Sequence, residues 1–274
     1  QEHPDRDEKW ADGMRAQLGE ERFRREMECE FIINDETLIA PTTLIDLEGR
    51  DPLYKTGEVR WYQRIEPNKI YVVALDPSLG TGGDPSAIQI FDANSTIQVG
   101  EWRHNKTDIP SQIRILADIV RHINETVRDP KSIYFSVENN TIGEAALISI
   151  AEYGEENIPA YFLSEPGVSV SRRFRKGFNT TNKSKLAACA KLKHLIESKR
   201  LTINSKSLVS ELKNFVATGT SYAAKVGETD DLVMSSLLAI RMLQLLQSYH
   251  QDLDEQMRDH QDIVIEPLPF VMTM

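Results

Sequence analysis

The chain has 274 residues, with 40% apolar and 27% charged residues, which is typical of a globular protein with room for one large domain and appendages. Its apolar runs are far too short to span a bilayer, and no basic-then-apolar signal segment opens it. The net charge of −10 argues, as an average, against a nucleic-acid-binding protein, and the two cysteines, Cys29 and Cys189, lack the spacing of a zinc site and favour a reducing compartment.

The first quarter of the chain differs in character from the rest. Residues 7–28 are dense in Glu, Arg and Lys and predict a helix, and residues 29–33 form a short apolar run. Residues 34–67 contain the breakers Pro41, Pro52 and Gly57 and are predicted to be irregular. We therefore expect an N-terminal extension over residues 1–60, a main domain over 61–250 and an acidic tail over 251–274.

The main domain alternates strands and helices. Strands are predicted over residues 70–76, 86–92, 96–103, 132–138, 159–163 and 201–203. Helices are predicted over residues 110–126, 141–152, 183–198, 205–215 and 231–248. Three consecutive strands, one helix and one strand, followed by alternating elements, are the order of an α/β fold of the RNase H-like (RuvC-type) class. Such a fold has a mixed sheet flanked by helices on both faces.

Acidic residues stand where several of these elements begin or end. Asp76 ends the first strand, Glu138 ends the strand after the first helix, and Asp230 and Asp231 stand at the start of the last helix. Asp84 lies in the loop after Asp76. Because the carboxyl ends of adjacent strands face one crevice, we expect Asp76 and Glu138 to meet there. The helix start is expected to bring Asp230 or Asp231 to the same place.

Converging carboxylates point to one kind of chemistry. Hydrolysis of a phosphodiester places negative charge on the attacking and leaving oxygens, which two Mg²⁺ or Mn²⁺ ions about 3.5–4 Å apart can stabilise. Magnesium prefers carboxylate and water oxygens, so neither His nor Cys is required. The set of acids predicts a metal-dependent nuclease.

Each acid also has a purely structural interpretation. Asp76 and Asp84 are residue types that form turns, and Asp230 is a residue type that caps helices. Glu138 is harder to explain in this way, because it follows the buried-type segment Phe-Ser-Val and is costly there unless paired or metal-bound. The four positions in this order are a stronger signal than any one of them.

A glycine-rich loop and a basic segment complete the pattern. The loop Leu-Gly-Thr-Gly-Gly-Asp over residues 79–84 lacks the Gly-Lys-Ser/Thr of a Walker A motif, and we expect it to be a tight turn near the metals. An actin-like nucleotide-binding protein is the alternative interpretation.

Residues 171–200 hold ten Lys and Arg against one acid, whereas residues 247–274 hold six acids against Arg258. The predicted DNA contacts are Arg172, Arg173, Arg175, Lys176, Lys183 and Lys185, with Thr181 as a candidate helix cap.

Four motifs in order resemble a known family. They are Val-Ala-Leu-Asp-Pro-Ser-Leu-Gly from residue 73, Ser-Val-Glu-Asn-Asn from 136, Lys-Gly-Phe-Asn-Thr-Thr-Asn-Lys-Ser-Lys from 176 and Thr-Asp-Asp-Leu-Val-Met-Ser from 229. They look like the C-terminal nuclease domain of the large terminase subunit of tailed phages, close to the T-even type. The segment over residues 22–31 looks like the junction that follows the family's packaging ATPase domain.

The resemblance implies a magnesium-dependent endonuclease that cuts concatemeric double-stranded DNA before and after packaging, in the cytoplasm of the infected bacterium. By position, the catalytic acids and metal ligands would be Asp76, Glu138 and one of Asp230 or Asp231, with Asp84 as an auxiliary ligand. Thr229 stands where the family often has His. The implied partners are an N-terminal ATPase domain, the portal protein and the small terminase subunit, with no membrane. A Holliday-junction resolvase and a non-catalytic DNA-gripping or docking module are the alternatives.

Overall fold

The computed structural model of the chain describes residues 12–13, 36–166 and 176–249. Several predictions lie outside these residues: most of the helix over 7–28, the apolar run over 29–33, the junction-like segment over 22–31, the acidic tail and the arginines at 172, 173 and 175. Described residues from Thr37 onward belong to one compact unit. The proposed division of the chain at residues 60 and 250 stays a prediction.

A seven-stranded mixed sheet forms the centre of this unit, in the order β1-β2-β5-β4-β3-β6-β7. Its strands are β1 (Tyr54–Thr56), β2 (Val59–Trp61), β3 (Tyr71–Asp76), β4 (Ser86–Asp92), β5 (Ile97–His104), β6 (Ile133–Val137) and β7 (Tyr161–Phe162). β4 pairs antiparallel with both β3 and β5, and β6 pairs parallel to β3. A separate antiparallel hairpin is made of β8 (Phe215–Thr218) and β9 (Ser221–Ala224).

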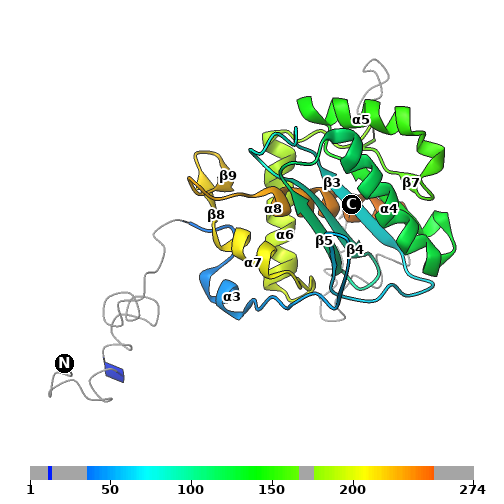
Figure 1. Cartoon of the computed structure of the whole chain (residues 1–274). Helices are drawn as coiled ribbons and strands as arrows, with labels where there is room; N and C mark the ends of the chain where they lie inside the picture. Colours follow the sequence, from blue (N-terminus) through cyan, green and yellow to red (C-terminus); the bar gives the residue numbers. More distant parts are fainter. Residues whose placement is uncertain (1–11, 14–35, 167–175, 250–274) are drawn as a thin grey trace, which may run out of the picture. The chain divides into compact units, whose positions relative to one another are not determined.

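Helices cover both faces of the sheet, as the order of elements predicted (Figure 1). They are α3 (Pro41–Asp46), α4 (Ile109–Val127), α5 (Thr141–Tyr153), α6 (Asn182–Glu197), α7 (Lys206–Lys213) and α8 (Asp231–Tyr249). Alternate residues of β3 enter two separate cores: Val72 and Ala74 join the core with α6, α7 and α8, whereas Val73 and Leu75 join the core with α4 and α5. The strand is buried on both faces, which explains its continuous apolar sequence.

Local sequence signals fix where the main helices begin. The Asp108 carboxylate accepts a hydrogen bond from the Ser111 N–H at the start of α4, and the Asn140 side chain does the same for the first turn of α5. Thr181 caps α6, as predicted, and forms a capping box with Ser184. Each cap satisfies backbone donors that the first helical turn leaves without a partner.

Three predictions of local structure were wrong. The stretch over residues 34–67 is not irregular throughout, because it contains α3, β1 and β2, and Pro41 occupies the first turn of α3, where proline is tolerated. Residues 201–203 form no strand and make only an isolated bridge from Thr202 to Ile97. The helix predicted to reach residue 215 ends at Lys213, and Phe215 begins β8.

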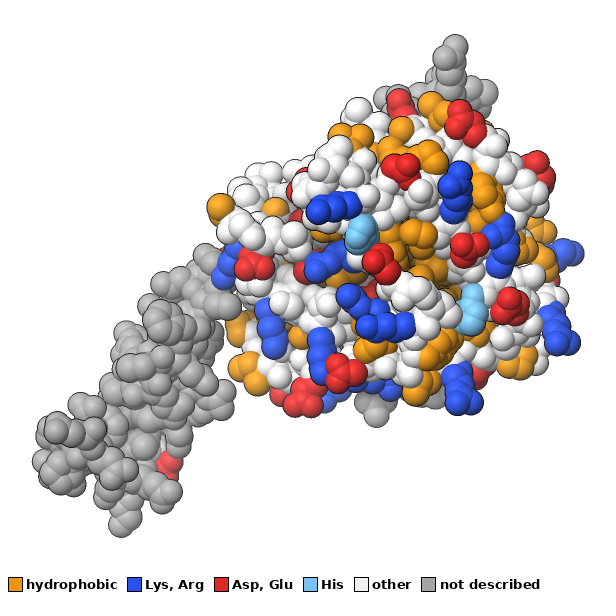
Figure 2. Space-filling view, viewed as in Figure 1, with side chains coloured by type: hydrophobic (Ala, Val, Ile, Leu, Met, Phe, Trp, Pro, Cys, Tyr) orange, Lys and Arg blue, Asp and Glu red, His pale blue; other side chains and the backbone are white. Residues whose placement is uncertain are grey.

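No helix in the described part of the chain is long and apolar enough to cross a membrane. On the face shown in Figure 2, acidic and basic side chains are interspersed with exposed apolar ones. The described part of this face therefore shows no large surface of a single charge.

Candidate metal centre

Two predicted acids lie side by side at the carboxyl edge of the sheet. Asp76 is the last residue of β3, and Glu138 directly follows β6. The parallel pairing of Leu75 with Val137 and the 3.0 Å hydrogen bond from Glu138 N–H to Leu75 C=O bring the two acids together. Asp76 projects from the same face of β3 as Val72 and Ala74, which is the face that α8 covers.

Burial and the neighbouring acids both disfavour the ionised form of Asp76. Burial raises the pKa of Asp76 well above its usual value, and the charge of Glu138 and a hydrogen bond to that carboxyl raise it further. Smaller contributions in the same direction come from Asp231 and Asp230. Asp76 and three further predicted acids therefore lie close enough to interact electrostatically, although they are up to 155 residues apart in sequence, from 76 to 231.

The start of α8 supplies the second half of the site. Burial, followed by the charges of Asp230 and Asp84, raises the pKa of Asp231 to about 6, while Arg103 acts in the opposite direction. The Asp231 Oδ2 atom is buried and has no hydrogen-bond partner among the described residues. The Asp230 carboxylate instead accepts a 3.3 Å hydrogen bond from the Ala224 N–H of β9. A buried carboxylate oxygen without a partner is the kind of atom that a cation satisfies.

Glu138 is buried at the strand end and accepts a hydrogen bond there. Its side chain is only 6% exposed, and its Oε2 accepts a 2.9 Å hydrogen bond from Asn140 Nδ2. The same Asn140 side chain caps α5 through its oxygen. On the other side, the backbone at Glu138 forms a parallel bridge with Phe178, which lies within the basic segment. The carboxylate orientation is thus coupled to the start of α5.

These residues fit a hard divalent cation by their chemistry. All the donors are carboxylate oxygens, which Mg²⁺ and Mn²⁺ prefer, and a bound cation would offset the repulsion that raises the pKa of Asp76. Among residues 12–13, 36–166 and 176–249, however, no three Asp, Glu, His or Cys side chains are arranged as a ready-made set of ligands. The structure therefore brings the acids together without showing a coordination geometry.

The predicted DNA contacts fall into three groups. Arg172, Arg173 and Arg175 lie outside the described residues. Lys176 contacts the Glu155 carboxylate, and its ammonium lies 5.4 Å from the centre of the Phe162 ring. Lys183 is exposed near the start of α6, and the Lys185 ammonium lies 5.5 Å over the Phe215 ring of β8.

The glycine loop has a partly different role from the one expected. Gly80 has a φ of +70°, and a Cβ at this position would lie 2.1 Å from the Thr107 carbonyl oxygen. Close packing against Thr107 therefore requires this glycine. Nothing lies within 4 Å of a Cβ built at Gly83.

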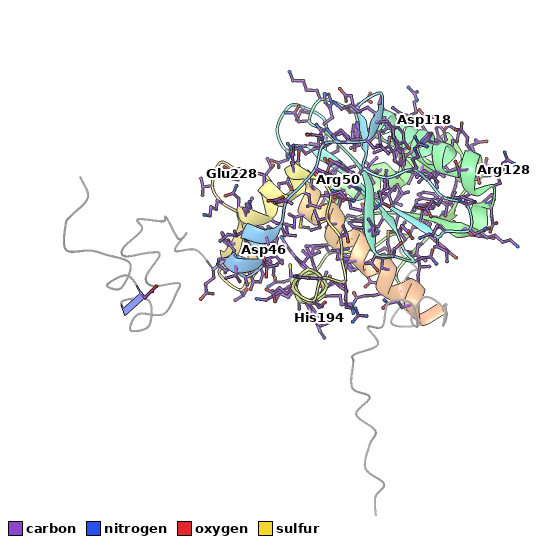
Figure 3. The ribbon with its side chains drawn as sticks, turned by 90° about the horizontal axis from the view of Figure 1, so that it is seen from below. Asp46, Arg50, Asp118, Arg128, His194 and Glu228 are labelled. Carbon is purple, nitrogen blue, oxygen red and sulfur yellow. The ribbon has the colours of Figure 1, made fainter. Side chains whose placement is uncertain are left out.

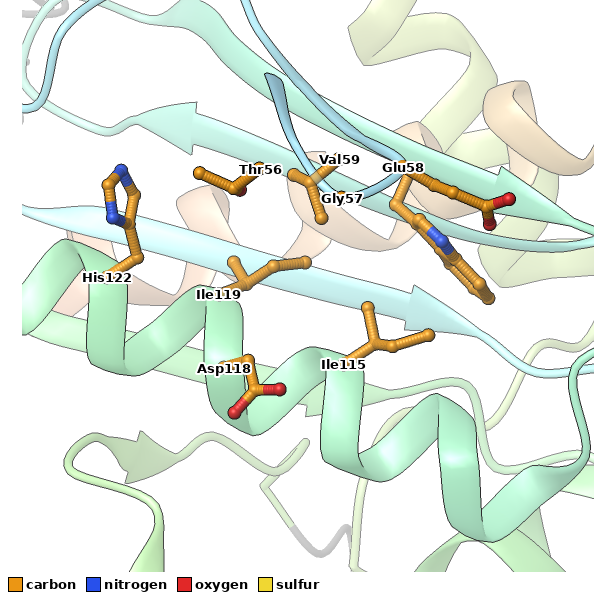
Figure 4. Close-up of a pocket in the computed structure, with 9 residues that line it drawn as sticks. Thr56, Gly57, Glu58, Val59, Ile115, Asp118, Ile119 and His122 are labelled. Carbon is orange, nitrogen blue, oxygen red and sulfur yellow. The ribbon is translucent and has the colours of Figure 1, made fainter. Parts of the chain in front are cut away.

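Two surface cavities lie away from the acids. They have volumes of about 370 and 470 Å³ and share His122 of α4 as a lining residue. Figure 4 shows the smaller one, between α4 and the β1–β2 turn, with Asp118 and Glu58 on its two sides. Neither cavity is lined by any of the predicted metal ligands.

Two charged residues near the site were not predicted from the sequence. Arg103, near the end of β5, forms a 2.5 Å ion pair with Glu211 of α7, which is only 5% exposed. Glu211 is one of the buried residues of its helix and lies one turn after the buried Leu208. The position of Glu211 among apolar residues is the sequence signal from which a buried, paired acid could have been predicted.

A match to a known family accounts for this combination of fold and acids. A model of the terminase RNaseH-like domain matches residues 73–243, more than half of the chain. The chain belongs to this family. The matched stretch begins in β3, ends in α8 and includes all five predicted metal ligands.

Solved terminase nuclease domains have a similar fold. The large terminase nuclease from thermophilic phage G20c with bound magnesium is 18% identical, with a TM-score of 0.56, over 75% of this chain and 97% of that chain. The large terminase nuclease domain of Thermus phage P74-26 is 20% identical, with a TM-score of 0.51, over 72% and 92%. The manganese-soaked human cytomegalovirus terminase nuclease domain is 11% identical, with a TM-score of 0.50, over 77% and 98%. The RNase H-like terminase fold is confirmed, and the T-even type stays a prediction.

Proposed function

We propose that this chain is the metal-dependent endonuclease domain of a viral DNA-packaging terminase, cutting concatemeric double-stranded DNA at the initiation and termination of packaging. The observation that carries the proposal is the convergence of Asp76, Glu138 and Asp231 at one edge of the sheet, close enough for their charges to act on one another. Family membership supports it, as do relatives solved with magnesium bound or after manganese soaking.

The roles of the acids follow from their positions. Asp76, Glu138 and Asp231 would hold Mg²⁺ or Mn²⁺, with two ions proposed, and Asp230 and Asp84 would be auxiliary ligands. A bound ion would polarise the phosphodiester and stabilise charge on the attacking and leaving oxygens. Asp231 is the preferred ligand at the helix start, because its Oδ2 has no partner in the described part of the chain, whereas Asp230 accepts a hydrogen bond from Ala224.

The proposal extends to the surroundings of the domain. In the full-length protein we place it after a packaging ATPase domain, in a motor with the portal protein and the small terminase subunit, in the host cytoplasm. Arg172, Arg173, Arg175, Lys176, Lys183 and Lys185 are the proposed contacts to the DNA backbone. Such contacts provide attraction that is independent of sequence.

Cleavage of supercoiled plasmid tests the proposal. With Mg²⁺ or Mn²⁺ the chain is expected to produce nicked and linear DNA, and EDTA is expected to prevent both. Four-way junctions and linear duplexes are expected to be cut at similar rates, and a strong preference for junctions would favour a resolvase instead. DNA binding without any cleavage in either metal would favour the non-catalytic docking module.

Replacing Lys183 and Lys185 together with Gln is expected to weaken DNA binding equally for unrelated sequences. Each lost phosphate contact should reduce the slope of log affinity against log salt by about 0.9, so the pair should reduce it by up to about 2. Binding is measured by fluorescence anisotropy across a salt series.

The matched control replaces Arg128 and Lys131, two exposed basic residues near the amino end of β6. Figure 3 shows Arg128 far from Glu228, which belongs to the loop that leads into α8. The control pair should leave the salt dependence unchanged. An unchanged affinity of the Lys183 and Lys185 variant at low salt would remove these two residues from the interface.

A further inference from the structure

A buried polar network lies directly behind the start of α8. Glu211 Oε1 accepts hydrogen bonds from Arg103 Nη1 at 2.5 Å and from Thr229 Oγ1 at 3.2 Å. Glu211 Oε2 accepts a 3.1 Å hydrogen bond from the Val233 N–H. The network joins β5 to α7 and the first turn of α8, and it spans a long stretch of sequence, since Arg103 and Glu211 differ by 108 positions.

Glu211, which belongs to α7, caps the first turn of the neighbouring helix α8. Val233 is the third residue of α8, and its N–H is one of the donors that a helix leaves without an internal partner. In most helices the residue just before the first turn supplies the acceptor. Here Asp230 directs its carboxylate to Ala224, and Glu211 accepts from Val233. Because Glu211 accepts the hydrogen bond from the Val233 N–H, the Asp231 carboxylate is not needed as an acceptor for that donor.

Arg103 lies in the same row of the sheet as the acids. Asp76 pairs with Ala87 across β3 and β4, and Ala87 pairs with Arg103 across β4 and β5. Residues paired in this way project from the same face of a sheet, so Arg103 projects toward the side of α8. Its side chain is 32% exposed, and its charge acts on Asp231. Arg103 is therefore a cation that is positioned to compete for Asp231.

We propose that Glu211 is a positioning residue for the candidate metal centre, which fixes the first turn of α8 and keeps Arg103 from pairing with Asp231. The inference rests on the proposed function, because it concerns how the metal-binding acid is presented. Thr229 accepts a 3.3 Å hydrogen bond from Arg103 and donates one to Glu211. It lies two positions before Asp231, so it links the network to the start of α8.

The test is a calorimetric titration of the full chain with Mn²⁺ in the absence of DNA, which gives the Mn²⁺ dissociation constant. Glu211→Gln keeps the shape and an acceptor for Val233 but removes the charge that holds Arg103. We expect its Mn²⁺ dissociation constant to rise about 10- to 100-fold, the usual effect of losing an outer partner of a metal ligand. Cleavage at low Mn²⁺ should fall in parallel and recover at high Mn²⁺, because the lost step is binding.

Two further variants separate this role from a merely structural one. In the Arg103→Gln, Glu211→Gln double variant the competing cation is gone, so Mn²⁺ affinity should recover by at least about tenfold relative to Glu211→Gln. Glu101→Gln is the matched control, since Glu101 is also a buried carboxylate that pairs with an arginine, Arg60, at 3.2 Å. This control should lower the melting temperature and leave Mn²⁺ affinity unchanged.

The outcomes separate this inference from the proposed function. Wild-type protein that neither binds Mn²⁺ nor cleaves DNA would overturn both. Wild-type protein that binds Mn²⁺, together with a Glu211→Gln variant of equal affinity, would overturn only the role of Glu211. Equal losses in the single and double variants would overturn the proposal that Glu211 acts through Arg103.

Discussion

An Asp76→Asn variant of the full chain is expected to cut supercoiled plasmid more than about 100-fold more slowly than wild type, which exceeds the usual cost of losing an outer partner of a metal site. The same variant is expected to melt at a higher temperature than wild type when both are in EDTA. The first effect follows from losing a proposed metal ligand. The second follows because the charge of Asp76 is unfavourable in the folded, metal-free protein.

The pH dependence of this second effect has a definite sign. Burial and the charge of Glu138 raise the pKa of Asp76, so the folded protein holds a proton on Asp76 at pH values where the unfolded chain has lost it. This destabilisation is complete above the folded-state pKa, declines steadily as the pH falls below that value, and vanishes only below the usual pKa of an aspartate in the unfolded chain. In EDTA, the gain in melting temperature from Asp76→Asn should therefore be larger at pH 8 than at pH 5.

Asp92→Asn is the matched control. Asp92 is also a buried aspartate at the end of a strand, but it pairs with Tyr71 at the opposite end of β3. Its carboxylate accepts a 2.9 Å hydrogen bond from Lys69 Nζ. Loss of that pairing should lower the melting temperature and leave cleavage unchanged. Wild-type cleavage by Asp76→Asn would exclude Asp76 from the catalytic centre.

The central part of the fold was predictable because its elements carry strong local patterns. The predicted strand over residues 86–92 coincides with β4, and the predicted helix over 110–126 lies within α4. The carboxyl-edge rule for α/β sheets then indicated that Asp76 and Glu138 would meet, and they do. Periodicity and one general rule of topology were sufficient for this part.

The missed elements depend on partners that are distant in sequence. β1 and β2 have three residues each, and β2 is a strand because Trp61 pairs with Gly100 of β5. The β8–β9 hairpin turns at Gly219, which has a φ of +60°, within a segment that has no long apolar pattern. Short strands are stabilised by tertiary pairing more than by local sequence. The partner of Glu211 was missed for the same reason, since Arg103 is 108 positions away and alone resembles an ordinary surface charge.

A Gly143→Ala variant is expected to lose cleavage activity by about 100-fold, although Gly143 carries no functional group. Gly143 lies in the first turn of α5, and a Cβ at this position would lie 1.9 Å from the backbone oxygen of Glu138. Backbone atoms cannot rotate away as a flexible side chain can, so either α5 or the backbone of Glu138 must move. A displacement of about 1 Å in a catalytic group is enough for a loss of this size.

The same substitution should also destabilise the fold, by about 1–3 kcal/mol, as expected for overpacking a closely packed site. Gly83→Ala is the matched control: it lies in the loop after Asp76, has no positive φ, and nothing lies within 4 Å of its Cβ. Both variants are measured by plasmid cleavage and by urea unfolding. Gly143→Ala with wild-type cleavage would show that the position of the Glu138 backbone does not limit the reaction, and would weaken the assignment of Glu138 to the metal centre. If the loss of activity exceeds the fraction unfolded in the assay, the displaced carboxylate is responsible, because unfolding alone reduces activity only in proportion to the folded protein that is lost.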